Sequence, residues 1–215
     1  MLILASASPR RRELLAQAGY AFEVRPAHVN EDVRAGEDPI AYVVRLAREK
    51  AQAVFDAMSA DGADSDSHPS ANSGRKDGAP SHLTDGGLVV LGADTTVTVD
   101  GHILAKPEDA ADAARMLRLL SGRTHRVATG VAVVTAKGAE VAAEVTGVRF
   151  VTLSDEEIAA YVATGEPMDK AGAYAIQGRA GKWIPRVEGC YFNVVGLPLA
   201  LVTTMLEAVG VRGAR

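Results

Sequence analysis

Three observations predict an α/β fold with a mixed, twisted sheet, flanking helices and a central cleft. Unbroken apolar runs at 2–5 and 88–91 are typical of strands covered on both faces. Apolar residues recur at helical spacing from Pro39 to Met58. Two long β-rich segments flank Lys137-Gly138 and indicate a hairpin. Strands and helices mix without strict β–α–β alternation, which favours a mixed sheet.

Composition excludes several functional classes. The chain has 215 residues, 47% hydrophobic and 23% charged, and can bury a real core. Its net charge of −4 provides no global basic field, so we expect no nucleic-acid or membrane partner. A single cysteine, Cys190, excludes an internal disulfide framework. No signal peptide or apolar stretch of ~18 residues is evident, so we expect a soluble, cytoplasmic protein.

The first helix is expected to carry an unusual charge. After the strand at 2–5, Ser8 is the predicted N-cap, Pro9 the first helical residue and Gly19 the residue past the end. Arginines at 10–12 then occupy the first turn, where the helix dipole is already positive. Either an anion, with phosphate the leading candidate, docks there, or the arginines form a solvated helix end.

The second helix, Pro39 to Met58, is the clearest. Lys50 lies on the flank of its apolar stripe, where it either binds phosphate or extends its amine to solvent. The predicted stripe is Ile40, Val43, Val44, Ala47, Ala51, Val54 and Met58, and the predicted outer face is Arg45, Arg48, Glu49 and Asp56.

The polar stretch at 59–87 contains Leu83 as its only large aliphatic residue. Such a composition cannot bury enough surface to order itself. We therefore predict a flexible surface insertion within one domain that spans 1–215.

Order resumes with the strand at 88–91, followed by Gly92–Thr95 and a β-rich 96–99. Asp100-Gly101 predicts a hairpin that returns through 103–104. Lys106–Asp109 is expected to open a helix that ends at Gly122, with Ala110, Ala114, Leu117 and Leu120 inward. The segments 124–135 and 140–152 form the second hairpin. A capping box of Ser154 and Glu157 starts a helix to about Ala163, and the last helix runs from 198 to 209.

Scattered charges outline a candidate site. Asp94 is expected just past the end of the most buried strand, where a carboxylate can hold a divalent cation and activate water. A turn aspartate that bonds its own backbone is the alternative. Glu31 and Asp32 could complete a magnesium site, and Lys106 is a further charge for phosphate. Gln177 closes a Gly-rich stretch and could read a base edge.

Seven short strings follow one another along the chain: Leu4–Arg11, Arg45–Ala51, Gly92–Thr95, Lys106-Pro107, Leu120–His125, Asp169–Tyr174 and Val195–Pro198. Together they resemble the Maf family of nucleoside triphosphate pyrophosphatases, and they cover nearly the whole chain outside 59–87. The resemblance implies a Maf/ITPase-like fold with a nucleotide-binding cleft, a divalent cation (Mg or Mn), a nucleoside triphosphate substrate and a homodimer as one possible assembly.

The resemblance also implies roles for individual residues. Hydrolysis would occur between the α and β phosphates, with Asp94 as general base and Glu31 beside it at the metal. Lys50 and Lys106 would join the catalytic set. The residues implied to contact substrate are Ser6, Arg10, Arg11, Thr95, Gln177, Asp169 and Lys170.

The string Gly-Ala-Asp-Thr resembles the subgroup that acts on dTTP and UTP, in which Arg10, Thr95 and Gln177 occupy specificity positions. Two rival functions stay open. One is a nucleotide-binding regulator of septum formation with little turnover, and the other a house-cleaning pyrophosphatase for purines such as ITP or XTP. Ala7, where the family more usually has glycine, and the 59–87 stretch depart from the family pattern.

Overall fold

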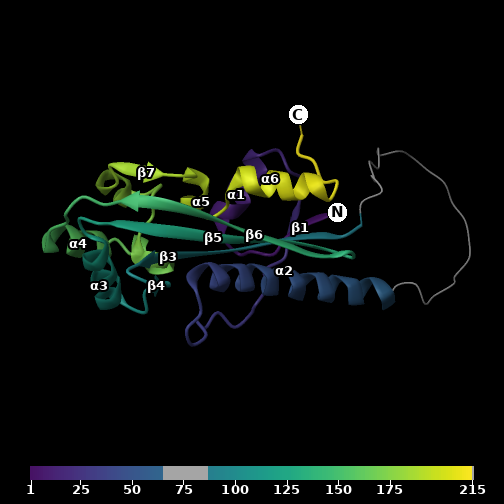
Figure 1. Ribbon diagram of the computed structural model, residues 1–215, viewed down its shortest axis with the longest axis horizontal. Coiled ribbons are helices and arrows are strands. Elements are labelled where there is room, and N and C mark those ends of the chain that lie inside the picture. The colour runs from purple at the N-terminus through teal and green to yellow at the C-terminus, as the bar shows by residue number, and fades with distance from the viewer. Residues whose placement is uncertain (65–86, 215) are drawn as a thin grey trace, which may run out of the picture.

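All strands of the described residues form one sheet (Figure 1). The structure is a computed structural model that describes residues 1–64 and 87–214. The strand order is β2-β1-β3-β5-β6-β7, with β4 also paired to β3. Strand β1 is parallel to β2 and β3, and every other pairing is antiparallel. The predicted mixed α/β class is therefore confirmed. The strands are β1 Leu2–Leu4, β2 Glu23–Val24, β3 Val89–Val99, β4 His102–Leu104, β5 Thr124–Thr135, β6 Gly138–Arg149 and β7 Arg186–Glu188.

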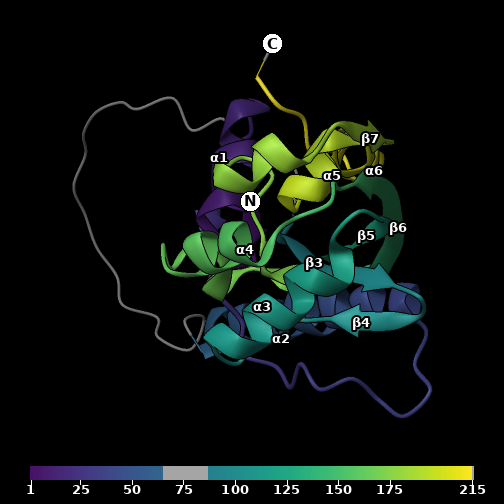
Figure 2. The same cartoon turned by 90° about the vertical axis from the view of Figure 1, so that its left-hand side faces the viewer.

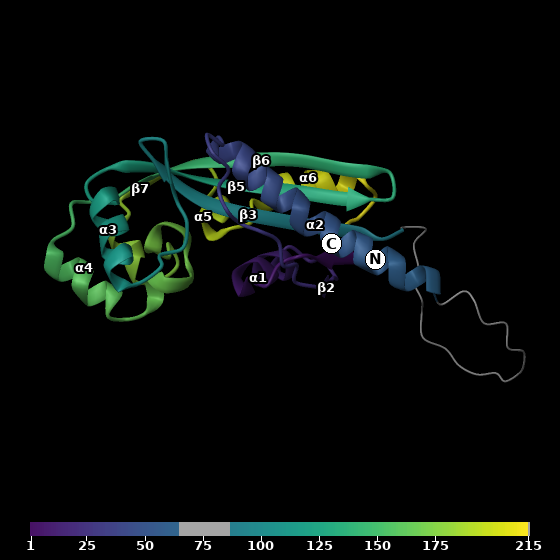
Figure 3. The ribbon, with the colours of Figure 1, turned by 90° about the horizontal axis from the view of Figure 1, so that it is seen from below.

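Helices cover both faces of this sheet and one end of it. Helix α2 crosses β3, β5 and β6 on one face, whereas α1, α5 and α6 lie on the other (Figures 1 and 3). Helices α3 and α4 gather with the short 3₁₀ turns at one end (Figure 2). No helix in the described ranges is both long and apolar enough to cross a membrane. The helices are α1 Pro9–Gln17, α2 Pro39–Asp64, α3 Ala110–Leu120, α4 Asp155–Val162, α5 Tyr191–Val195, α6 Leu199–Ala208, and the 3₁₀ turns η2 Glu166–Asp169, η3 Ala171–Ala173 and η4 Arg179–Trp183.

Strand β3 has an uncovered stretch on one of its edges. Strand β5 pairs with it continuously from Val90 to Thr98. On the opposite edge β1 pairs only with 89–91 and β4 only with 97–99. Within the described residues, 92–96 therefore have no strand beside them on that edge. Asp94 lies in this stretch, in the middle of β3, so the prediction that the strand ends before it was wrong; pairing with β5 carries the strand onward.

Two glycines let α2 lie directly on the sheet next to Asp94. A Cβ atom on Gly92 would come within 2.2 Å of the Ala47 carbonyl oxygen, and one on Gly130 within 2.3 Å of that of Val43. Gly130 is the cross-strand partner of Asp94, and Gly92 lies two residues before it. Because alternate residues of a strand share a face, the Asp94 side chain points to the α2 side.

Helix α2 differs from its prediction in length and rotation. It continues to Asp64, so residues 59–64 are helical and not part of a surface loop. The rest of the predicted insertion, 65–86, lies outside the described residues. The buried rows are Val43–Ala47–Ala51 and Tyr42–Leu46–Lys50, each at i, i+4 spacing. Ile40 belongs to neither row and is 45% exposed, contrary to the prediction.

The other predicted elements agree with the structure apart from their ends. Ser8 caps α1 and Pro9 is its first residue. The capping box of Ser154 and Glu157 is present, and the Asp100-Gly101 turn has φ angles of 51° and 80°. Helix α3 starts only at Ala110, because the Asp109 side chain caps it, and Ala110 is exposed rather than inward. The last helix, α6, matches its prediction within one residue at each end.

A buried histidine lies among aromatic rings at the end of the sheet that α3 and α4 cover. His125 is 1% exposed, its Nε2 lies 2.8 Å from the Tyr174 hydroxyl, and its Nδ1 has no hydrogen-bond partner in the described part of the chain. The rings of Phe150 and Tyr174 meet it edge to face. Burial lowers the pKa of His125 from 6.5 to about 4.

This histidine is expected to make the fold sensitive to acid. Its folded-state pKa is depressed, so the unfolded chain binds the proton more readily, and stability is lost as pH falls from 6.5 toward about 4. The loss is about 1.4 kcal/mol per pH unit from this group. The free energy of unfolding in urea should depend less steeply on pH in His125→Gln than in wild type. His102 is exposed, so His102→Gln should show the same pH dependence as wild type. Equal slopes for all three proteins would refute this account.

Candidate active site

A cleft of about 350 Å³ opens at the uncovered stretch of β3, a volume typical of small-molecule sites. Asp94 and Thr95 point to opposite faces of β3, so the cleft extends around the strand edge. Asp94 points toward Lys50 of α2, and Thr95 toward Arg11 of α1. The lining comes from the β1–α1 turn and the start of α1, the loop before α2, α2 itself, β3, β5 at Val127, and residues 105–106, 169–171, 174–177 and 194–196.

Lys50 joins two carboxylates at the floor of the cleft. Its Nζ lies 2.7 Å from Asp94 Oδ1 and 2.6 Å from Glu31 Oε1. Lys50 and Asp94 are buried, whereas half of the Glu31 side chain is exposed. The Lys50 amine therefore does not extend to solvent, and its place between the two carboxylates keeps it at the cleft. Its buried row on α2 places it against the sheet.

The two carboxyl groups have opposite pKa shifts. Burial raises the pKa of Asp94 above its ordinary value, although Lys50 and Arg11 oppose the shift. Burial also acts to raise the pKa of Glu31, but the hydrogen bond and charge of Lys50, with the charges of Lys106 and Arg11, bring it below its ordinary value. A pair separated in this way suits one group to accept a proton while the other stays ionised.

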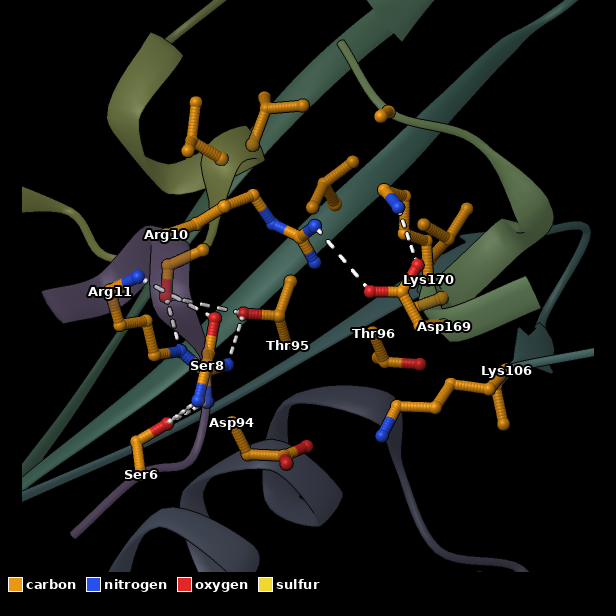
Figure 4. Close-up of a pocket in the computed structure, with 18 of the residues that line it drawn as sticks. Ser6, Ser8, Arg10, Arg11, Asp94, Thr95, Thr96, Lys106, Asp169 and Lys170 are labelled. Atoms are coloured by element: carbon orange, nitrogen blue, oxygen red, sulfur yellow. Dashed lines mark hydrogen bonds and ion pairs between the residues drawn. The ribbon is translucent and has the colours of Figure 1, made fainter. Parts of the chain in front are cut away.

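Arg11 uses its guanidinium to connect protein segments. It donates to Ser6 Oγ at 3.2 Å and to Thr95 Oγ1 at 2.9 Å (Figure 4). It also donates to the Ala93 carbonyl at 2.9 Å and to the Gly196 carbonyl at 2.8 Å. These bonds tie the β1–α1 turn to β3 and to the turn before α6. The first turn is thus not a wholly solvated helix end, because Arg11 bonds to acceptors of the protein.

The other two arginines of the first turn of α1 do not share the protein-bonded position of Arg11. Arg10 reaches across the cleft, with its Nη1 3.8 Å from Asp169 Oδ2, and Arg12 is exposed. Ala7, which lies between β1 and these arginines, does not have a positive φ angle. Alanine is therefore not strained at this position, where the family more usually has glycine. The basic first turn is therefore divided among the cleft, the protein interior and solvent.

The remaining predicted residues form the far wall and mouth. Lys170 donates to Asp169 and, at 2.8 Å, to the Glu166 carbonyl oxygen. Gln177 lines the cleft and is exposed. Lys106 is exposed, and its amine points into the cleft toward Asp94 (Figure 4). Asp32 is not in the lining: its carbonyl oxygen accepts a hydrogen bond from Arg45, so of the predicted acidic pair only Glu31 reaches the site.

Arg45 was wrongly placed on the solvated face of α2. Its side chain is 13% exposed, and its Nε and Nη2 lie 2.6 and 2.7 Å from the two Glu37 carboxylate oxygens. The hydrogen bond from Arg45 lowers the pKa of Glu37 to about 2. Tyr42, which sequence reasoning missed, donates to the Glu31 carbonyl at 2.8 Å. Its i, i+8 spacing from Lys50 was the available clue, since it places both on one helix face.

The acidic residues fit a divalent cation that the substrate helps to bind. Asp94 and Glu31 already converge on one cation, the Lys50 amine. Among the described residues no group of three or more His, Cys, Asp or Glu could hold a metal ion without further ligands. Magnesium commonly uses one or two carboxylates together with substrate phosphates and water. The donor set is thus consistent with such an ion when a polyphosphate is present.

The fold and site define an α/β protein whose cleft combines paired carboxylates with converging cations, as a polyphosphate site requires. The chain belongs to the Maf family: the family model described as Maf-like protein matches residues 1–209. A protein of Koribacter versatilis (strain Ellin345) named dTTP/UTP pyrophosphatase is 50% identical, over 98% of this chain and 95% of its own. Proteins with that name from Moorella thermoacetica (strain ATCC 39073 / JCM 9320) and Hahella chejuensis (strain KCTC 2396) are 49% and 46% identical over 98% of this chain, and over 95% and 93% of their own lengths.

Proposed function

We propose that this protein hydrolyses dTTP and UTP to the nucleoside monophosphate and pyrophosphate. The observation that carries the proposal is the Asp94–Lys50–Glu31 cluster at the uncovered edge of β3. It lies in a chain about half identical, over nearly its full length, to proteins named for that activity.

In the proposed reaction Asp94 is the general base. Its carboxylate accepts a proton from a water molecule whose oxygen attacks the α-phosphorus. The bond from that phosphorus to the bridging oxygen breaks, and the electron pair leaves with pyrophosphate. The raised pKa of Asp94 favours proton acceptance, and Lys50 stays beside it to balance the negative charge.

Cations around the cleft would hold the triphosphate. Lys106, which is exposed, and Arg10, which is partly buried, are cations that line the cleft, and Ser6 lies at its floor. Asp94 and Glu31 would bind Mg or Mn, which supplies charge neutralisation to the phosphates when bound. Arg11 would act through its charge and its bracing of the β1–α1 turn.

In this proposal, Arg10, Thr95 and Gln177 select the base. They line the cleft, with Asp169 and Lys170 beside them. Thr95 Oγ1 lies 2.9 Å from both Arg11 Nη2 and Thr129 Oγ1, which holds its side chain at the strand edge. Gln177 has an amide with both a donor and an acceptor and can pair with a pyrimidine edge. We further propose that the chain works as one domain in the cytoplasm, where nucleotide substrates occur, and we keep a homodimer as the assembly to test.

The proposal is tested by assaying a nucleotide panel with magnesium and separating the products. We expect dTTP and UTP to give monophosphate and pyrophosphate. Orthophosphate and diphosphate products would place attack at the γ-phosphorus and refute the reaction. Faster turnover of ITP, XTP or 7-methyl-GTP would refute the base assignment, and binding without turnover would favour the regulator of septum formation.

A further inference from the structure

We propose that Tyr161 and Glu166 are positioning residues for base selection. They anchor both ends of the turn that presents Gln177 to the cleft. The inference deepens the proposed function and rests on it, because it takes Gln177 to face the base.

The turn that carries Gln177 is short and closed. The Gly178 amide donates to the Ala175 carbonyl at 3.1 Å, which makes residues 175–178 a four-residue turn. Gln177 is its third residue and lines the cleft. The Gln177 side-chain amide makes no hydrogen bond to a described residue. The position of the Gln177 backbone, from which that side chain extends, therefore depends on the backbone contacts of the turn.

One tyrosine–glutamate pair binds the backbone on both sides of this turn. The Tyr161 hydroxyl accepts from the Ala175 amide at 3.2 Å and donates to Glu166 Oε1 at 2.7 Å. The Glu166 carboxylate accepts from the Arg179 amide, with its oxygens 3.1 and 3.3 Å away. The anchors thus flank Gln177 at positions two residues before and two residues after it.

The anchors are themselves held in place. Tyr161 is 4% exposed, and its ring meets that of Trp183 edge to face at 5.0 Å. Glu166 opens η2, and its carbonyl oxygen accepts from Lys170. A Cβ atom on Gly178 would lie 2.1 Å from Glu166 Oε1, so only glycine lets the turn approach this carboxylate.

A fixed turn matters because an amide can serve two bases. The uracil edge offers a carbonyl acceptor beside an N–H donor, and cytosine offers the reverse order. A glutamine that rotates by half a turn satisfies either one. Selection of uracil or thymine therefore needs a turn held so that the amide reaches the base in one of these two orientations, and small misplacements weaken such recognition strongly.

The test compares kcat and KM for UTP and CTP in wild type, Tyr161→Phe, Glu166→Gln and Glu166→Ala. We expect Glu166→Ala and Tyr161→Phe to lower the UTP-to-CTP ratio of kcat/KM by roughly tenfold, about the effect of one lost hydrogen bond of 1 to 1.5 kcal/mol. The change should appear mainly in the KM for UTP. Glu166→Gln retains one acceptor oxygen and should recover part of the ratio. Hydrogen exchange at the Arg179 amide should accelerate in Glu166→Ala.

Controls separate this role from general stability. Glu156→Gln changes an exposed acid on α4, and Tyr20→Phe removes a hydroxyl from a buried tyrosine outside the cleft; both should retain the wild-type ratio. An unchanged ratio in folded Glu166→Ala and Tyr161→Phe overturns the inference, as does unchanged Arg179 exchange. A wild-type protein without preference for UTP over CTP is a different failure, because it refutes the proposed base assignment itself.

Discussion

Replacing Asp94 by asparagine is expected to lower kcat for dTTP and UTP by about 10² to 10⁴-fold, the usual cost of losing a general base. Asparagine has nearly the same shape but cannot accept the proton from water. It also removes one of the two carboxylates that would bind the divalent cation. Steady-state assays at saturating magnesium measure the loss.

The matched control is Asp56→Asn. Asp56 is an exposed residue of α2 that accepts a hydrogen bond from Gln52, and the side-chain oxygen of asparagine can still accept that bond. It should keep wild-type turnover. Near wild-type kcat in Asp94→Asn would show that another carboxylate is the base. Glu31 would then be the first candidate, since it shares the Lys50 amine with Asp94.

Lys50→Met is expected to reduce both activity and stability. The change removes the cation from between two carboxylates and leaves Asp94 buried without its closest partner. Breaking such a pair typically costs about 3 kcal/mol or more, unless the remaining acid takes up a proton. A protonated Asp94 cannot act as base, so kcat/KM should fall at least about 10²-fold. Thermal unfolding and steady-state kinetics measure the two effects.

Arg48→Met is the control, because it removes an exposed cation from the same helix. Arg45 is unsuitable, since it forms a bidentate pair with Glu37. In the double variant Lys50→Met with Asp94→Asn we expect much of the lost stability to return, because no uncompensated aspartate remains, while activity stays low. A double variant as unstable as Lys50→Met would show that the lysine acts through packing rather than charge.

Local patterns in the sequence were sufficient for most element positions. The caps at Ser8 and Ser154 and the turn at Asp100-Gly101 depend on residues within four positions of each other, so the sequence states them directly. Charge and position along the chain predicted several candidate site residues, and the family resemblance supplied the rest. The structure brings every residue that the resemblance implied into the lining of one cleft. Asp32 is the predicted acidic residue that it leaves outside.

The sequence by itself determined the element types, the mixed sheet and the set of charged residues available for chemistry. Tertiary structure decided which charges meet. Lys50 and Asp94 are 44 positions apart, and they touch because Gly92 and Gly130 let α2 lie directly on β3 and β5. Periodicity gives the buried face of a helix only to within part of a turn, which is why Ile40 and Arg45 were misplaced. The open edge at 92–96 likewise depends on where β1 and β4 stop pairing, a property of three strands together that no local pattern contains.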